Sequence, residues 1–176
     1  MRASRRSRAV ACLLLAFAAA CARGPRAGDP APSGAGSAAL VREAQAFMES
    51  YANDLRTGAR EAIAARYDSR GAYMVGFGAS RLVPADSLRA SYMTTWRQPA
   101  SFEWRGLAYE PAGTDAVVVT GQFAWGRPGR APMVFTYTGL LVRRDGRLRI
   151  RLEDEDPAPP PPSAAPPAPS DSARGR

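Results

Sequence analysis

Hydrophobic residues between Ser37 and Thr57 recur at three- and four-residue steps and predict an amphipathic helix. Ser37 is a candidate N-cap, and Gly58 is suited to end the helix. We expect its buried stripe to contain Leu40, Val41, Ala44, Phe47, Met48, Tyr51 and Leu55. A second, shorter helix is predicted over Ala59–Tyr67. A third begins at Pro84, which favours a first helical turn, and ends before Pro99.

The remaining chain contains short extended runs bounded by turn residues, which predict strands. Ala72–Phe77 and Arg81–Val83 read as two short strands around a glycine turn. Four longer strands follow, and the tight Asp145-Gly146 turn joins the last two. We expect these four strands at Ala100–Glu110, Ala116–Trp125, Met133–Arg144 and Arg147–Asp154. This order of elements predicts an α+β domain with helices packed on one face of an antiparallel sheet.

Alternation along the strands predicts which side chains point inward. Odd-numbered apolar residues share one face of the strands at 116–125 and 133–144. In the last strand Leu148, Ile150 and Leu152 share the inner face, and Arg147, Arg149 and Arg151 share the outer one. We expect these arginines to protect an exposed sheet edge, with binding of an acidic partner as the alternative.

The ends of the chain differ in composition from this block. Residues 1–21 combine four arginines with an apolar run of twelve and predict a signal peptide. The run ends Ala18-Ala19-Ala20-Cys21, which resembles a bacterial lipobox with Cys21 as the lipidated residue; ordinary cleavage is the alternative. Residues 22–36 are expected to be a flexible linker, 37–156 the folded domain, and 157–176 a disordered proline-rich tail. We therefore expect an exported, lipid-anchored envelope protein, or otherwise a soluble periplasmic or secreted one.

Charge and composition exclude several kinds of chemistry. The 176 residues hold 24 basic residues, all of them arginine, 16 acidic residues, two cysteines and no histidine. Residues 37–156 contain 16 arginines and 14 acids, so their net charge of +2 is too balanced for a nucleic-acid-binding surface. Without histidine or a free thiol in the mature domain, neither a histidine-based catalytic triad nor a zinc site is available. We expect no metal and no cofactor.

The stretch AQAFMESYANDLRTGAREAIAARY and the strand pair FTYTGLLVRRDGRLRIRLEDED resemble the nuclear-transport-factor-2-like superfamily, which includes SnoaL-like cyclases and ketosteroid isomerases. The resemblance covers residues 38–156. It implies a cone-shaped curved sheet with three N-terminal helices on its concave face and a pocket in the open end. A homodimer formed through the outer sheet face is also common in relatives.

The resemblance transfers little catalytic chemistry to this chain. Tyr51 matches the oxyanion-hole tyrosine of the steroid isomerases, but Val75 occupies the position of their general base, and Leu140 that of their second acid. On the last strand only Asp154 would offer a carboxylate to the pocket. We therefore expect a cone without an isomerase-type acid–base pair.

Aromatic residues are the main candidates for a ligand pocket, and core filling is the alternative. Asp68, beside Arg66 and Arg70, is a further candidate acid, although an exposed ion pair is the expected role. The candidate pocket residues are Tyr51, Tyr67, Tyr73, Phe77, Trp96, Phe123, Trp125, Phe135 and Tyr137. Three functions remain open: a tethered module that binds a small apolar ligand or supports protein contacts, a SnoaL-like enzyme using Tyr51 with Asp68 or Asp154, and a dimeric envelope scaffold.

Overall fold

The computed structural model describes residues 34–159. The predicted signal peptide, Cys21, most of the linker and most of the proline-rich tail lie outside these residues. Within them, three helices and six strands follow one another in the order α1, α2, β1, β2, α3, β3, β4, β5 and β6.

The three helices form close to their predicted positions. Helix α1 spans Gly34–Thr57, α2 spans Arg60–Ala64 and α3 spans Ala85–Thr94. Ser37 lies inside α1, so its prediction as the N-cap is wrong. Helix α1 buries one stripe at helical spacing, because every third or fourth side chain returns to the same face. The buried residues of this stripe are Leu40, Ala44, Met48, Tyr51, Ala52 and Leu55.

The six strands form one mixed sheet in the order β2-β1-β6-β5-β4-β3. The strands span Ala72–Gly76 (β1), Ala79–Val83 (β2), Ser101–Pro111 (β3), Ala116–Arg127 (β4), Arg130–Arg144 (β5) and Arg147–Pro157 (β6). All neighbouring pairs are antiparallel except β1 and β6, which run parallel. The α+β class is confirmed, and the sheet is mixed where a purely antiparallel one was expected.

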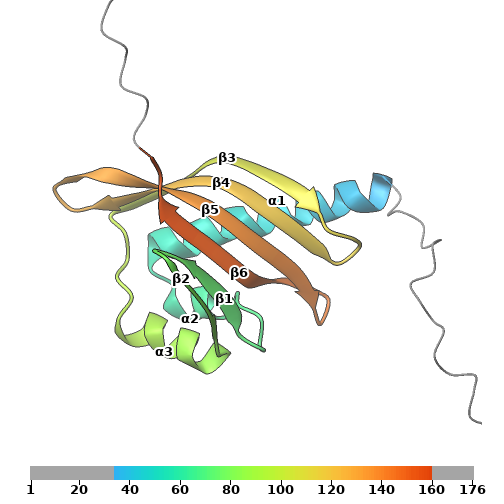
Figure 1. Ribbon diagram of the computed structural model, residues 1–176, viewed down its shortest axis with the longest axis horizontal. Coiled ribbons are helices and arrows are strands. Elements are labelled where there is room, and N and C mark those ends of the chain that lie inside the picture. The colour runs from blue at the N-terminus through green and yellow to red at the C-terminus, as the bar shows by residue number, and fades with distance from the viewer. Residues whose placement is uncertain (1–33, 160–176) are drawn as a thin grey trace, which may run out of the picture. The chain divides into compact units, whose positions relative to one another are not determined.

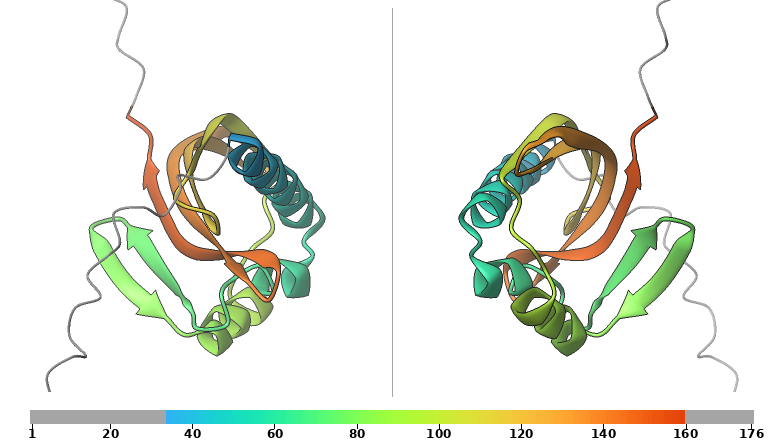
Figure 2. Two further views of the ribbon diagram at one scale, coloured as in Figure 1. Left: turned by 90° about the vertical axis from the view of Figure 1, so that its right-hand side faces the viewer. Right: turned by 90° about the vertical axis from the view of Figure 1, so that its left-hand side faces the viewer.

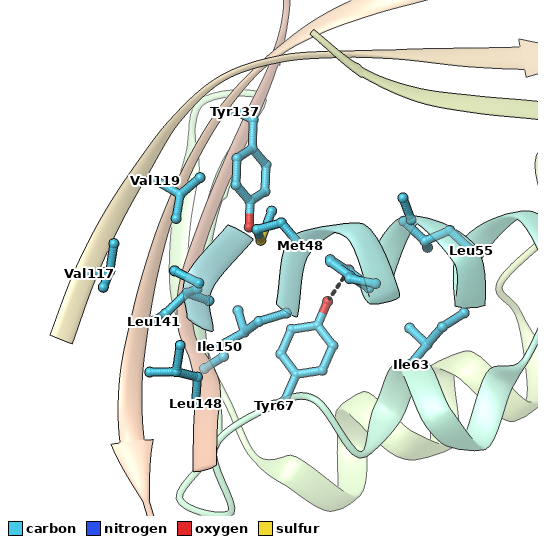
Figure 3. Packing of buried hydrophobic residues seen from close by; sticks show 14 of the residues in the cluster. Met48, Leu55, Ile63, Tyr67, Val117, Val119, Tyr137, Leu141, Leu148 and Ile150 are labelled. Carbon is cyan, nitrogen blue, oxygen red and sulfur yellow. Dashed lines mark hydrogen bonds between the residues drawn. The ribbon is translucent and has the colours of Figure 1, made fainter. Parts of the chain in front are cut away.

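Helix α1 lies across the concave side of the curved strands β3 to β6, which do not close into a barrel (Figure 1; Figure 2). The core fills the space between them (Figure 3). Its members that are almost wholly inaccessible to solvent include Met48, Ile63, Val117, Val119, Tyr137, Leu141 and Ile150. The predicted inner face of β4 and β5 is therefore confirmed.

Strand β6 is an interior strand of the sheet, so the predicted role of its arginines at an exposed edge is wrong. It pairs with β5 on one side and with β1 on the other. Arg149 and Arg151 instead bind backbone carbonyls of the segment between α2 and β1. Arg149 donates to the Ala65 carbonyl, and Nη1 of Arg151 lies 2.6 Å from the Gly71 oxygen.

A β-bulge in β6 changes which of its side chains face the cone interior. Leu140 of β5 pairs with Leu152, whereas the next residue, Leu141, pairs with Ile150, which leaves Arg151 as the extra residue. One extra residue exchanges the two faces of the strand beyond it. Ile150 is therefore buried before the bulge and Glu153 after it, and the prediction that Leu152 and Asp154 face inward is wrong.

Candidate functional site

The carboxyl group of Glu153 lies inside the cone, where tyrosine hydroxyls surround it. Glu153 is 2% exposed. Its Oε2 accepts a hydrogen bond from the Tyr67 hydroxyl at 2.6 Å, and its Oε1 accepts one from Tyr137 at 3.2 Å. Tyr67 follows α2 and Tyr137 belongs to β5, and Figure 3 shows both side chains pointing into the interior.

Tyr67 connects Glu153 to two further hydroxyls. Its oxygen lies 2.6 Å from the Tyr92 hydroxyl and 3.2 Å from that of Tyr51. A phenol has a single proton. When Tyr67 donates that proton to Glu153, Tyr92 and Tyr51 must donate to Tyr67. All donors of this network then point toward the carboxylate.

Burial controls the protonation of this cluster. Desolvation raises the pKa of Glu153 to about 7, and the hydrogen bonds from Tyr67 and Tyr137 partly oppose this rise by stabilising the carboxylate. Burial and the nearby Glu153 charge together hold the pKa values of Tyr67 and Tyr137 well above 10.0. These phenols therefore remain protonated donors near neutral pH.

An open cleft of about 550 Å³ lies beside this cluster, since the Trp96 ring in its lining is 5.8 Å from the Tyr92 ring. Two pairs of rings form much of its wall. The centroids of Trp96 and Trp125 are 6.4 Å apart with their planes at 88°, and Phe123 stacks on Phe135 at 5.1 Å. The lining consists of Phe77, Trp96, Arg97, Gln98, Phe123, Trp125, Gly126, Arg127, Pro128, Phe135 and Glu155.

Glu155 is the acidic residue in the lining of this cleft. Among residues 34–159, no side chain forms a hydrogen bond or an ion pair with its carboxyl group. Desolvation, followed by repulsion from Glu153 and Asp154, raises the pKa of Glu155 to about 8. A carboxyl group of this kind can both accept and release a proton near neutral pH. The expectation that Asp154 is the only carboxylate of the last strand at the pocket is therefore wrong: Glu153 is buried in the cone and Glu155 lines the cleft.

The structure separates the predicted pocket residues into three groups. Tyr51, Tyr67 and Tyr137 lie in the Glu153 cluster, where their hydroxyls are bonded to one another or to the carboxyl group. Tyr73 is 42% exposed, and its ring lies under the Arg151 guanidinium at 5.1 Å, so its prediction as a pocket residue is wrong. The residues that line the cleft are Phe77, Trp96, Phe123, Trp125 and Phe135.

The two acids predicted from the sequence lie elsewhere. Asp68 is buried, contrary to the exposed ion pair expected, and it binds Arg70 and Arg144. Although burial alone would raise the pKa of Asp68, hydrogen bonds from these two arginines lower it. Asp154 alternates with Glu153 and Glu155 along β6 and is therefore on the opposite face, paired in register with Thr138 and Val75.

The two positions matched to the isomerases carry no titratable group, as the sequence showed. Val75 is on β1, in register with Asp154. Leu140 is on β5, in register with Leu152 and next to the bulge of β6. The acids of this site come instead from β6. Sequence reasoning missed them because regular alternation from Ile150 and Leu152 places Asp154 inward, whereas the bulge at Arg151 places Glu153 and Glu155 on that side.

Within residues 34–159, no group of three or more acidic, cysteine or histidine side chains could hold a metal ion. No helix there is both long enough and apolar enough to cross a membrane.

Comparison with known proteins identifies the fold. No family model and no curated protein matches the sequence. Among solved structures, an NTF-2-like protein of unknown function from Shewanella oneidensis has a TM-score of 0.60 at 14% identity, over 66% of this chain and 98% of that one. A protein from Novosphingobium aromaticivorans, provisionally named a scytalone dehydratase, has a TM-score of 0.56 at 12% identity, over 69% and 85%.

A third structure, from Parabacteroides distasonis and provisionally named a ketosteroid isomerase, has a TM-score of 0.53 at 13% identity, over 61% of this chain and 82% of that one. The three TM-scores establish the fold, and the low sequence identities leave the activity open. The chain therefore has the nuclear-transport-factor-2-like fold, as its resemblance implied.

The raised pKa values predict that the protein loses stability as the pH rises. An unperturbed glutamate titrates near 4.5, whereas Glu153 and Glu155 titrate near 7 and 8 in the folded state. Between these values the folded state binds more protons than the unfolded state. The free energy of unfolding therefore falls by up to about 1.4 kcal/mol per pH unit for each group. Thermal denaturation from about pH 5 to about pH 8 measures this slope.

Variants with neutral isosteres show how much of the pH dependence of stability comes from Glu153 and Glu155. The double variant Glu153→Gln, Glu155→Gln should have a much shallower slope and should be at least as stable as the original protein at the alkaline end. Asp154→Asn, on the opposite face of β6, should keep the original slope. An unchanged slope in the double variant would show that neither carboxyl group is the source.

Proposed function

We propose that this domain binds a small, largely apolar molecule in the cleft at the open end of the cone. The observation that supports this proposal is the lining of the cleft: five rings on four different segments line a space of about 550 Å³, which is the size of a small-molecule site. Flat apolar ligands pack well against such rings.

The position of Glu155 supports a specific rather than a merely hydrophobic site. Apolar walls supply most of the binding energy of a small ligand, and a few polar groups fix its orientation. Glu155 offers a carboxyl group that no described residue engages, so a ligand group can bind it without displacing an internal partner. Gln98 adds an amide to the same lining.

Proton-transfer catalysis is a second candidate function, and the pKa of Glu155 favours it. A general acid or base works best when its pKa lies near the working pH, and Glu155 titrates near 8. Two of the similar structures have provisional enzyme names, a dehydratase and a ketosteroid isomerase. In this chain the reacting carboxyl group would be that of Glu155, and negative charge on Glu153 would help to keep the pKa of Glu155 raised.

Native mass spectrometry of the protein purified from its own host tests the binding function. We expect a bound small molecule in the spectrum. Trp125→Leu should reduce its occupancy at least about tenfold, because a ring is removed from the cleft wall. Tyr73→Leu removes an exposed ring outside the cleft and should not change the occupancy. Equal occupancy in both variants would move the binding site away from the cleft.

Hydrogen exchange tests the catalytic function with the same molecule. An enzyme that removes and returns a proton on carbon should introduce deuterium into the bound molecule in heavy water. Glu155→Gln should abolish this exchange, and Asp154→Asn should preserve it. Exchange at the uncatalysed rate with the original protein would leave binding as the function and contradict catalysis.

We further propose that the chain is exported and anchored in the bacterial envelope through lipid on Cys21. The support is in the sequence: the arginine-rich start, the apolar run and the small residues before Cys21. A homodimer through the outer sheet face, acting as an envelope scaffold, is the alternative function. The subunit count in the native mass spectrum tests it.

Cys21→Ala should release the protein from membranes without changing its folding, because the predicted anchor precedes the folded domain. Fractionation of cells followed by circular dichroism of the soluble protein measures both effects. A variant that still needs detergent for extraction would indicate a different anchor.

A further inference from the structure

The four consecutive acids at the end of β6 have different surroundings, and this difference bears on what the cleft binds. Glu153 is bonded by Tyr67 and Tyr137. Asp156 accepts a hydrogen bond from the Phe77 backbone nitrogen at 2.6 Å. Asp154 is on the opposite face of the strand. Glu155 alone combines a position in the cleft lining with a carboxyl group that no described residue engages.

The rings beside Glu155 are suited to a positive charge. Tryptophan is the best aromatic partner for a cation, since the ring face is electron-rich. Trp96 already contacts one cation of the protein, because the Arg60 guanidinium carbon lies 5.7 Å from its ring centre. A cationic ligand group in the cleft would meet indole rings and a carboxylate together, which is a stronger site than either provides alone.

The two arginines in the lining, Arg97 and Arg127, do not pair with Glu155 in place of a ligand cation. Arg97 is exposed, and its Nη1 lies 3.3 Å from each of the Thr94, Thr95 and Trp96 carbonyl oxygens, so the end of α3 engages it. Arg127 is exposed beside the turn between β4 and β5. Neither forms an ion pair with Glu155 in the described part of the chain. The carboxylates of Glu153 and Asp154 add negative charge around Glu155.

We propose that the cleft recognises an organic cation, an apolar molecule whose ammonium group binds Glu155 beside the indole rings of Trp96 and Trp125. This inference rests on the proposed ligand-binding function and names the chemical class of the ligand. Binding would favour the carboxylate form, so Glu155 would release a proton as the cation enters.

Two probes of the same shape test the inference on the full-length protein. In tert-butylbenzene a carbon atom replaces the nitrogen of phenyltrimethylammonium, so the two differ by one charge. Calorimetry at a pH above the Glu155 pKa of about 8 should show the cation binding at least about tenfold more tightly than the neutral probe. Quenching of tryptophan fluorescence reports the same binding, since Trp96 and Trp125 line the cleft.

Variants and pH assign the preference to Glu155. Glu155→Gln should bring the two affinities within about twofold of each other, and Asp154→Asn should retain the difference. In the original protein the cation affinity should rise by up to about tenfold per pH unit from about pH 6 to about pH 8. The heat of binding in buffers of different ionisation enthalpy should show a released proton. These two readouts need no variant, so the test stands even if Glu155→Gln folds poorly.

The possible contrary results separate this inference from the proposed function. Equal affinity for the two probes, with fluorescence quenching by both, would overturn the cation inference and support the apolar cleft. Tighter binding of benzoate than of the cation would overturn it and assign recognition to Arg97 and Arg127. Binding of neither probe would overturn the inference, and the native mass spectrum would then decide the proposed function independently.

Discussion

The arrangement of this site depends on one extra residue in β6. The bulge at Arg151 exchanges the two faces of the strand, so that Ile150 and Glu153 both point into the cone although they differ in parity. Side-chain contacts hold the extra residue in place: its guanidinium donates to the Gly71 carbonyl and lies over the Tyr73 ring. The aliphatic core before the bulge and the acidic site after it therefore share one strand.

The free-energy cost of burying Glu153 is reduced because tyrosine hydroxyls donate hydrogen bonds to its carboxyl group. An unpaired carboxylate inside a protein costs several kcal/mol, and a hydrogen-bonded one costs much less. Tyr67, which comes from the segment after α2, donates to one oxygen, and Tyr137 of β5 donates to the other. The same cluster affects the cleft, since charge on Glu153 raises the pKa of Glu155. Core packing and site chemistry are thus coupled through these two acids.

The sequence predicted the fold better than the site, for physical reasons. Helical periodicity identified the face of α1, and alternation identified the inner faces of β4 and β5, because those patterns depend on regular geometry. The bulge is irregular: regular alternation places Asp154 inward, and the extra residue Arg151 places Glu153 and Glu155 there instead. The neighbour of β6 was also missed, since the parallel pairing of β1 with β6 joins residues far apart in sequence. Asp68 was expected to be exposed because its partner Arg144 lies on the distant strand β5.

Glu153 and Glu155 share the inward face of β6, and burial raises their pKa values to about 7 and about 8. Carbon-13 NMR of labelled glutamate side chains tests these pKa values directly, because the carboxyl shift follows the protonation of each group. We predict two glutamates with midpoints near 7 and 8, both absent from the spectrum of the Glu153→Gln, Glu155→Gln variant. A spectrum in which every glutamate of the folded protein titrates near 4.5 would contradict this account.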